Sequence, residues 1–163
     1  MSTRDEIFSG TKEIDQKLDF NHNSLSVYLK STIGSSTEIL EIKQFKGGQS
    51  NPTYFIKTNK ADYVVRRKPP GKLLPSAHAV DREYKVITAL NKTDVPVPKS
   101  YALCEDEDII GTAFYLMEFK DGRVFWDPTM ANSSAEEALG VYSSMNHTLA
   151  KLHSVDPIYL ELE

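Results

Sequence analysis

The sequence predicts an α+β fold: a five-stranded antiparallel sheet with one inserted helix, preceded by a helix and followed by the first helix of a second unit. Three observations predict it. Short apolar and β-branched runs alternate with turn residues between residues 39 and 119. One segment among them, residues 77–91, spaces its apolar residues as a helix does. After about residue 122 only helical spacing follows, which places a domain boundary there.

Composition narrows the functional classes. The chain has 163 residues, 40% of them apolar and 26% charged, with a net charge of −4. These values are typical of a soluble globular protein and argue against a nucleic-acid binder, which usually carries a basic excess. No apolar run is long enough to cross a bilayer, and the acidic, polar N-terminus resembles neither a secretory signal nor a transit peptide. We expect a cytoplasmic protein, with the peroxisome or mitochondrion as alternatives.

The elements before the sheet come first in the chain. Residues 1–22 are a polar N-terminal segment that we expect to be loosely ordered. Ser24 can cap a helix that ends at Gly34 and presents one apolar face. We therefore place the boundaries of the units at 1–22, 23–121 and 122–163.

Five strands and two further helices follow. The expected strands cover residues 39–46, 53–58, 63–67, 100–105 and 112–119. Ser76 is a candidate cap for the inserted helix, and Asp106-Glu107-Asp108 reads as a turn between the last two strands. Ser134 and Glu137 fit a capping box that begins the final helix, which runs to about His153.

A glycine turn between the first two strands could wrap phosphates. It reads Gly47, Gly48, Gln49, Ser50, Asn51. Glycine lets the backbone approach closely, and backbone N–H groups donate to anionic oxygens. The alternative is an ordinary hairpin loop that tolerates glycine, since the turn is not a G-x-G-x-x-G.

Alternation along the third strand predicts which side chains share a face. If Val64 faces a cleft where an adenine could lie, Arg66 faces it too, and Glu83 on the inserted helix could hold the guanidinium. Arg67 and Lys68 would then be surface or loop residues. The alternative is an exposed basic strand end and a helix-surface glutamate.

The fifth strand ends in a possible hinge. A backbone there could hydrogen-bond the edge of an adenine, and Met117 could pack on its ring beside Glu118 and Phe119. The alternative is the buried edge of a sheet. His153 and Ser154 are better explained as a helix end than as a catalytic dyad, and we assign neither a catalytic nor a metal-binding residue.

Taken together, several stretches resemble one family. The sequence is similar, over about residues 20–160, to the aminoglycoside phosphotransferase and choline kinase-like family. More narrowly it resembles the subfamily found alone in bacteria and fused ahead of an acyl-CoA dehydrogenase in animals. The resemblance lies in GGQSNPTY (47–54), VRRKPPGKLLPSAH (65–78), DREY (81–84), VPVP (95–98), FYLMEF (114–119) and LAKLHS (149–154).

The resemblance implies a protein-kinase-like small lobe that binds ATP. It implies transfer of the γ-phosphoryl group to a small-molecule hydroxyl, expected on a hydroxyacyl-CoA of fatty-acid breakdown in the dehydrogenase-fused branch. By matching position, residues 47–51 form the phosphate loop, Arg66 the phosphate-binding cation and Glu83 its partner. Glu118 and Phe119 take the place of the adenine hinge.

The family's catalytic loop, a His-Gly-Asp motif with a following asparagine, and its later magnesium-binding aspartate do not occur in the 163 residues. We therefore expect magnesium binding only in an intact domain, no phosphoryl transfer by this chain, and a fragment, short isoform or incomplete product. The apolar face of the final helix should be exposed and should promote self-association. The rival hypotheses are a non-catalytic, pseudokinase-like nucleotide-binding module and an N-terminal domain of an acyl-CoA dehydrogenase polypeptide.

Overall fold

One antiparallel sheet organises the protein. A computed structural model describes residues 7–47, 50–74 and 77–162. The sheet has six strands in the order β1-β2-β3-β4-β6-β5, and every neighbouring pair is antiparallel. The strands are β1 (Thr11–Lys12), β2 (Ile39–Phe45), β3 (Thr53–Thr58), β4 (Asp62–Arg67), β5 (Ser100–Cys104) and β6 (Phe114–Glu118).

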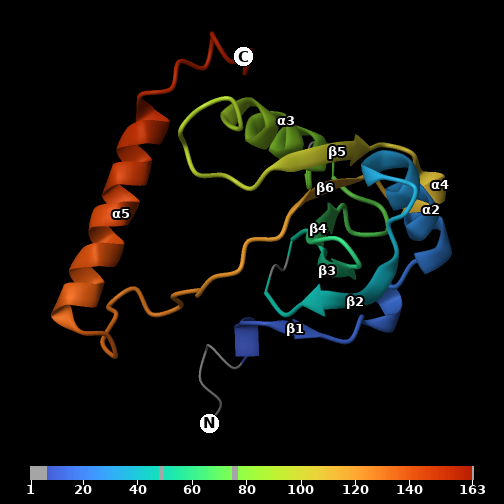
Figure 1. Ribbon diagram of the computed structural model, residues 1–163, viewed down its shortest axis with the longest axis horizontal. Coiled ribbons are helices and arrows are strands. Elements are labelled where there is room, and N and C mark those ends of the chain that lie inside the picture. Colours follow the sequence, from blue (N-terminus) through green and yellow to red (C-terminus); the bar gives the residue numbers. More distant parts are fainter. Residues whose placement is uncertain (1–6, 48–49, 75–76, 163) are drawn as a thin grey trace.

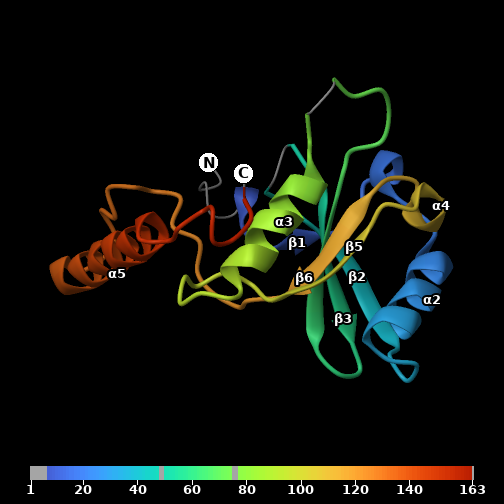
Figure 2. The ribbon, with the colours of Figure 1, turned by 90° about the horizontal axis from the view of Figure 1, so that it is seen from above.

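Three of the helices, α2, α3 and α4, lie on the two faces of this sheet (Figure 2). Figure 2 shows α2 and α4 on one side and α3 on the other. The described helices are η1 (Gln16–Leu18), α2 (His22–Ile33), α3 (Val80–Leu90), α4 (Glu107–Ile110) and α5 (Ala135–His153).

The main core lies between α2 and the sheet. Leu25 and Leu29 of α2 are fully buried in one cluster with residues of the four strands β3, β4, β5 and β6. Burying one such side chain contributes about 1.5–3 kcal/mol relative to exposure. The sheet residues of this core are Tyr54, Ile56, Tyr63, Val65, Cys104, Phe114 and Leu116.

A smaller cluster fixes α3 on the opposite face. Val80, at the start of α3, is fully buried against Ala113 and Tyr115, and Tyr84 and Ile87 pack beside them. Because residues i, i+3, i+4 and i+7 share one side of a helix, this stripe sets the rotation of α3. Glu83 borders the stripe and therefore lies next to the sheet.

Most predicted elements form, with local differences. The five predicted strands are confirmed within two residues at each end, and Ser134 accepts from the backbone N–H of Glu137 at the start of α5, as the capping box predicts. The sixth strand, β1, was not predicted, and α4 begins within the expected turn at Asp106-Glu107-Asp108, with Asp106 as its N-cap. Asn21, not Ser24, caps α2, because its side chain accepts from the Ser24 N–H. The predicted cap Ser76 lies outside the described residues.

The expectation that Arg67 lies at the surface is wrong. Arg67 is 2% exposed. Alternation puts it on the α2 face, and the segment before α2 covers it: the guanidinium donates to the carbonyls of Ile110 and Leu18 at 2.8 and 3.1 Å. It also lies 5.3 Å from the ring centre of Phe20 and 5.6 Å from that of Tyr54. Burial lowers the pKa of this guanidinium. The segment just before α2 is therefore held against the sheet by its contacts with Arg67.

Helix α5 projects away from the sheet (Figure 1). None of its residues, all of which the structure describes, is buried. The predicted exposed apolar face is confirmed, with the side chains of Leu139, Tyr142, Met145, Leu149 and Leu152 each at least 42% exposed. Within the described part of the chain, no helix combines the length and apolar character needed to span a membrane.

Candidate functional site

The largest described cavity opens on the α3 side of the sheet. Its volume is about 1090 Å³. Val64 and Arg66 of β4, Met117 of β6, residues 8–11 and residues 119–126 are among those that line it. The predicted sharing of one face by Val64 and Arg66 is thus observed, since both line the same cavity.

Arg66 and Glu83 form an ion pair at one end of this cavity. Arg66 Nε donates to Glu83 Oε2 at 2.7 Å, and Nη2 donates to Oε1 at 3.3 Å. The Arg66 side chain is 26% exposed and that of Glu83 34%. Nη1 donates to the Thr53 hydroxyl at 3.0 Å. Two parallel charge-assisted hydrogen bonds fix the plane of the guanidinium as well as its position.

Other donors converge on the Glu83 carboxylate. The Tyr115 hydroxyl donates to Oε2 at 3.1 Å, and Asn51 Nδ2 donates to Oε1 at 2.9 Å. Burial by itself raises the pKa of Glu83, but the hydrogen bonds from Arg66, Tyr115 and Asn51 outweigh it and hold that pKa below its ordinary value. Burial likewise lowers the pKa of Arg66, and the bonds to Glu83 more than reverse that effect. Both partners are therefore charged over the physiological range.

A second cavity lies against α3 on the other side of this pair. Its volume is about 940 Å³, and Arg66 lines both cavities. Ser50, Asn51 and Glu83 line it too, together with His78 and Arg82. His78 Nδ1 lies 2.9 Å from Asn51 Oδ1. The amide of Asn51, which is 2% exposed, thus joins the end of the glycine turn to α3.

The large cavity also has an aromatic part. Phe119 stacks on Phe45 with ring centres 6.3 Å apart and meets Phe55 edge to face at 4.9 Å. Val64, 5% exposed, and Met117 lie in the same cavity. Such a surface suits a flat ring system.

The predicted hinge differs in its backbone donors. The N–H of Glu118 donates to Lys99 O at 2.8 Å, and that of Phe119 donates to Asp62 O at 3.3 Å. Both donors are therefore used within the sheet, and the edge of a bound ring would have to use other backbone groups of this strand end. The Glu118 carboxylate pairs with Lys120 Nζ at 2.8 Å.

Sequence reasoning missed the aromatic pair that meets the glycine turn. An added Cβ on Gly47 would lie 3.2 Å from the carbonyl oxygen of Phe8 and 3.6 Å from the Trp126 ring. The Phe8 and Trp126 rings are 5.3 Å apart, and Trp126 Nε1 donates to the Ser9 hydroxyl at 2.8 Å. Phe8 and Trp126 are 118 positions apart in the chain, so no local pattern links them. Gly48 and Gln49 lie outside the described residues.

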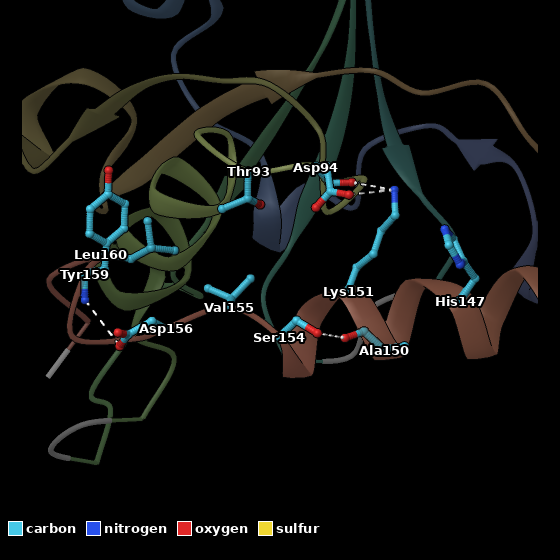
Figure 3. A pocket seen from close by; sticks show the side chains of 10 residues that line it. All are labelled: Thr93, Asp94, His147, Ala150, Lys151, Ser154, Val155, Asp156, Tyr159 and Leu160. Atoms are coloured by element: carbon cyan, nitrogen blue, oxygen red, sulfur yellow. Dashed lines mark hydrogen bonds and ion pairs between the residues drawn. The ribbon is translucent and has the colours of Figure 1, made fainter.

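A third, smaller cavity of about 520 Å³ lies between the C-terminal end of α5 and the loop after α3 (Figure 3). There Lys151 Nζ pairs with Asp94 Oδ2 at 3.0 Å (Figure 3). The Ser154 hydroxyl donates to the Ala150 carbonyl at 2.8 Å, as a helix end does, so it is not aimed at His153. This cavity contains none of the predicted site residues. Among the described residues, no group of three or more His, Cys, Asp or Glu side chains is placed to hold a metal ion.

Comparison with known proteins shows which family the chain resembles. Residues 41–163 match the model of the phosphotransferase enzyme family. The chain is 43% identical over 147 residues to acyl-CoA dehydrogenase family member 10 of Mus musculus, covering 90% of this chain and 14% of that protein. It is 42% identical over 159 residues to family member 11 of Homo sapiens, covering 95% and 20%.

A solved structure shares the fold. It is a protein from Ralstonia eutropha proposed to be an aminoglycoside phosphotransferase, with a TM-score of 0.73 and 42% identity, covering 87% of this chain and 40% of that one. The chain thus spans about a fifth or less of the two curated relatives described above. A kinase-like α+β fold, a family model covering three quarters of the chain and these relatives agree: the chain belongs to the phosphotransferase enzyme family.

Proposed function

We propose that this chain is the ATP-binding portion of a kinase-like phosphotransferase that acts on a small-molecule hydroxyl. Residues 23–121 would form the nucleotide-binding unit, and residues 122–163 would begin a helical unit. The observation that carries the proposal is the Arg66–Glu83 pair, a fixed cation at the junction of an aromatic cavity and a glycine turn.

The aromatic part of the cavity would hold the adenine. Val64 and Met117 offer an apolar floor, and Phe119 lies in the same cavity. We place the adenine edge at the strand end formed by Glu118 and Phe119, where carbonyl oxygens or a later N–H would have to serve, because the two N–H groups are used in the sheet.

The phosphates would lie beside Arg66, under the turn of residues 47–51. Glu83, Thr53 and the carbonyl of Asn51 hold the guanidinium in one orientation, so it would meet an anion without reordering. A guanidinium fork suits phosphate oxygens geometrically and electrostatically.

The described residues do not fit a magnesium site. Two of the acidic residues that line the large cavity are paired, Glu41 with Lys43 and Glu118 with Lys120, and Glu83 pairs with Arg66. Asp121 also lines the cavity, but no group of three or more possible ligands forms among the described residues. We therefore derive no step through a metal. In an intact enzyme, a base and metal ligands from a larger helical unit would supply the chemistry of phosphoryl transfer. The names of the curated relatives favour an acyl-CoA-linked acceptor, such as a hydroxyacyl-CoA.

Calorimetric titration tests the proposal. Wild-type protein should bind ATP more tightly than adenosine, and Arg66→Met should weaken ATP binding about tenfold, or ~1.4 kcal/mol, while adenosine binding stays the same. Lys30→Met, on α2 at the opposite face, is the matched control for loss of a positive charge and should bind as wild type. Equal ATP affinity in wild type and Arg66→Met would refute the role of Arg66.

The rival, a nucleotide-binding module without catalysis, uses the same cavity. It predicts ATP affinity that is unchanged by magnesium and a functional effect on a partner domain. The phosphotransferase proposal predicts affinity that rises with magnesium once the rest of the catalytic domain is present, and no transfer of labelled phosphate by the 163-residue chain alone.

A further inference from the structure

We propose that His78 is a positioning residue for the proposed phosphate-binding site beside Arg66. It would act through the buried amide of Asn51. The inference rests on the proposed function and adds to it a residue outside the glycine turn and the ion pair. His78 lies just before α3, and its ring lines the second cavity.

The hydrogen bonds around Asn51 allow only one orientation of its side-chain amide. The carboxylate of Glu83 can only accept, so the Asn51 group that faces it must be the NH₂, as observed at 2.9 Å. The amide oxygen must then face His78 Nδ1, 2.9 Å away, and Nδ1 must carry a proton. His78 is thus the donor that completes the amide.

Asn51 in turn connects three parts of the proposed phosphate-binding site: the glycine turn, α3 and Arg66. It is the last residue of the glycine turn, its amide binds Glu83 on α3, and its main-chain oxygen accepts from Arg66 Nη1 at 3.4 Å. Without the His78 donor, the buried amide oxygen would lack its partner. Turning the amide over would not satisfy that oxygen, because it would then face the Glu83 carboxylate, which can only accept and therefore repels it. Either result disturbs the pair that orients Arg66.

The backbone of His78 supports this assignment. Its φ is +57°, in the left-handed region that few residues other than glycine adopt, although asparagine, aspartate and histidine are found there more often than the rest. The Val80 N–H donates to the His78 carbonyl at 2.9 Å, which tightens the chain just before α3. The ring of the residue in this bend lies 2.9 Å from the Asn51 amide oxygen, so the bend and the contact occur together.

The test uses His78→Ala and the conservative variant His78→Asn. The asparagine Nδ2 has the same reach from Cβ as histidine Nδ1, can donate to Asn51, and tolerates the left-handed conformation. His153→Ala, at the C-terminal end of α5, is the matched control. Two quantities are measured: the dissociation constants for ATP and adenosine, and the NMR signal of the Arg66 Nε–H, which is protected while it is bonded to Glu83.

We expect His78→Ala to weaken ATP binding about tenfold, with adenosine binding unchanged, and to weaken the protection of the Arg66 signal. His78→Asn and His153→Ala should keep both properties. Equal loss of ATP and adenosine affinity, a fully protected Arg66 signal in His78→Ala, or no rescue by His78→Asn would each overturn the proposal. If wild type binds neither ligand, the proposed function fails, and the Arg66 signal alone then decides whether His78 orders the pair.

Discussion

The strength of the Arg66–Glu83 pair can be measured without any ligand. A double-mutant cycle combines Arg66→Met, Glu83→Gln and the double variant, with the free energy of unfolding obtained from urea denaturation. The cycle isolates the coupling between the two side chains, provided that each single change removes the interaction without creating a new one.

The structure sets the expected size of this coupling. A hydrogen bond to a charged group contributes about 1.5–3 kcal/mol, and two such bonds join these residues at 2.7 and 3.3 Å. Their side chains remain 26% and 34% exposed, so water screens the pair. We therefore expect a coupling free energy of about 1–2 kcal/mol, between the values typical of surface and buried pairs.

The pH dependence of the free energy of unfolding tests the direction of the Glu83 pKa shift. The pKa of Glu83 is lower in the folded protein than its ordinary value of 4.5. The unfolded chain therefore binds the proton more readily, and stability falls as the pH drops below about 4.5 towards the folded-state pKa. The stability difference between wild type and Glu83→Gln should be constant near neutral pH and should shrink in that acidic range.

Denaturation curves of all four proteins, recorded at pH 7 and at several acidic values, provide the assay. A coupling free energy below about 0.3 kcal/mol would mean that the pair is not formed in solution, since this is the error of additivity for independent sites. A difference between wild type and Glu83→Gln that grows on acidification would refute the direction of the Glu83 pKa shift.

Three further changes test other parts of the structure. Arg67→Met should lower the free energy of unfolding by about 2 kcal/mol, because the bonds to Ile110 and Leu18 are lost, and should hasten proteolysis near Leu18; unchanged stability would show that this buried cation is dispensable. Gly47→Ala should cost about 1 kcal/mol and shift the fluorescence of Trp126, the sole tryptophan, because the new Cβ meets Phe8 and Trp126; an unshifted spectrum would place that ring elsewhere. Leu139→Glu combined with Leu149→Glu should abolish the self-association that we expect of wild type in sedimentation experiments, with stability changed by less than about 0.5 kcal/mol; a wild type that is monomeric at all concentrations would contradict this use of the α5 face.

The parts of the fold that sequence predicts are those with a local signal. Apolar and β-branched runs bounded by turn residues located β2 to β6, and alternation along β4 placed Val64 and Arg66 on one face. The helical stripe of α3 placed Glu83 at its edge, which made a pair with Arg66 one of two alternatives, and the structure shows the pair. The apolar face of α5 could likewise be predicted from the helical spacing of its apolar residues.

The features that the sequence did not reveal depend on contacts between distant segments. Two residues are too few to show strand alternation, so β1 is recognisable only from its pairing with β2. Arg67 was expected at the surface because its contacts with Leu18 and Phe20 join residues far apart in the chain, and no local pattern indicates them. The same holds for the contact of His78 with Asn51, which joins positions 27 residues apart.

The central claim is that ATP binds in the cavity beside Arg66, and NMR titration tests it most directly. Adding ATP should shift the methyl signals of Val64 and Met117 and the Arg66 Nε–H signal at one common dissociation constant, while the methyl signals of Leu25 and Leu29 beneath α2 stay in place. Adenosine should shift the two methyl signals without the Arg66 signal. Shifts confined to α5 and the loop after α3, or no shift at millimolar ATP, would contradict the account.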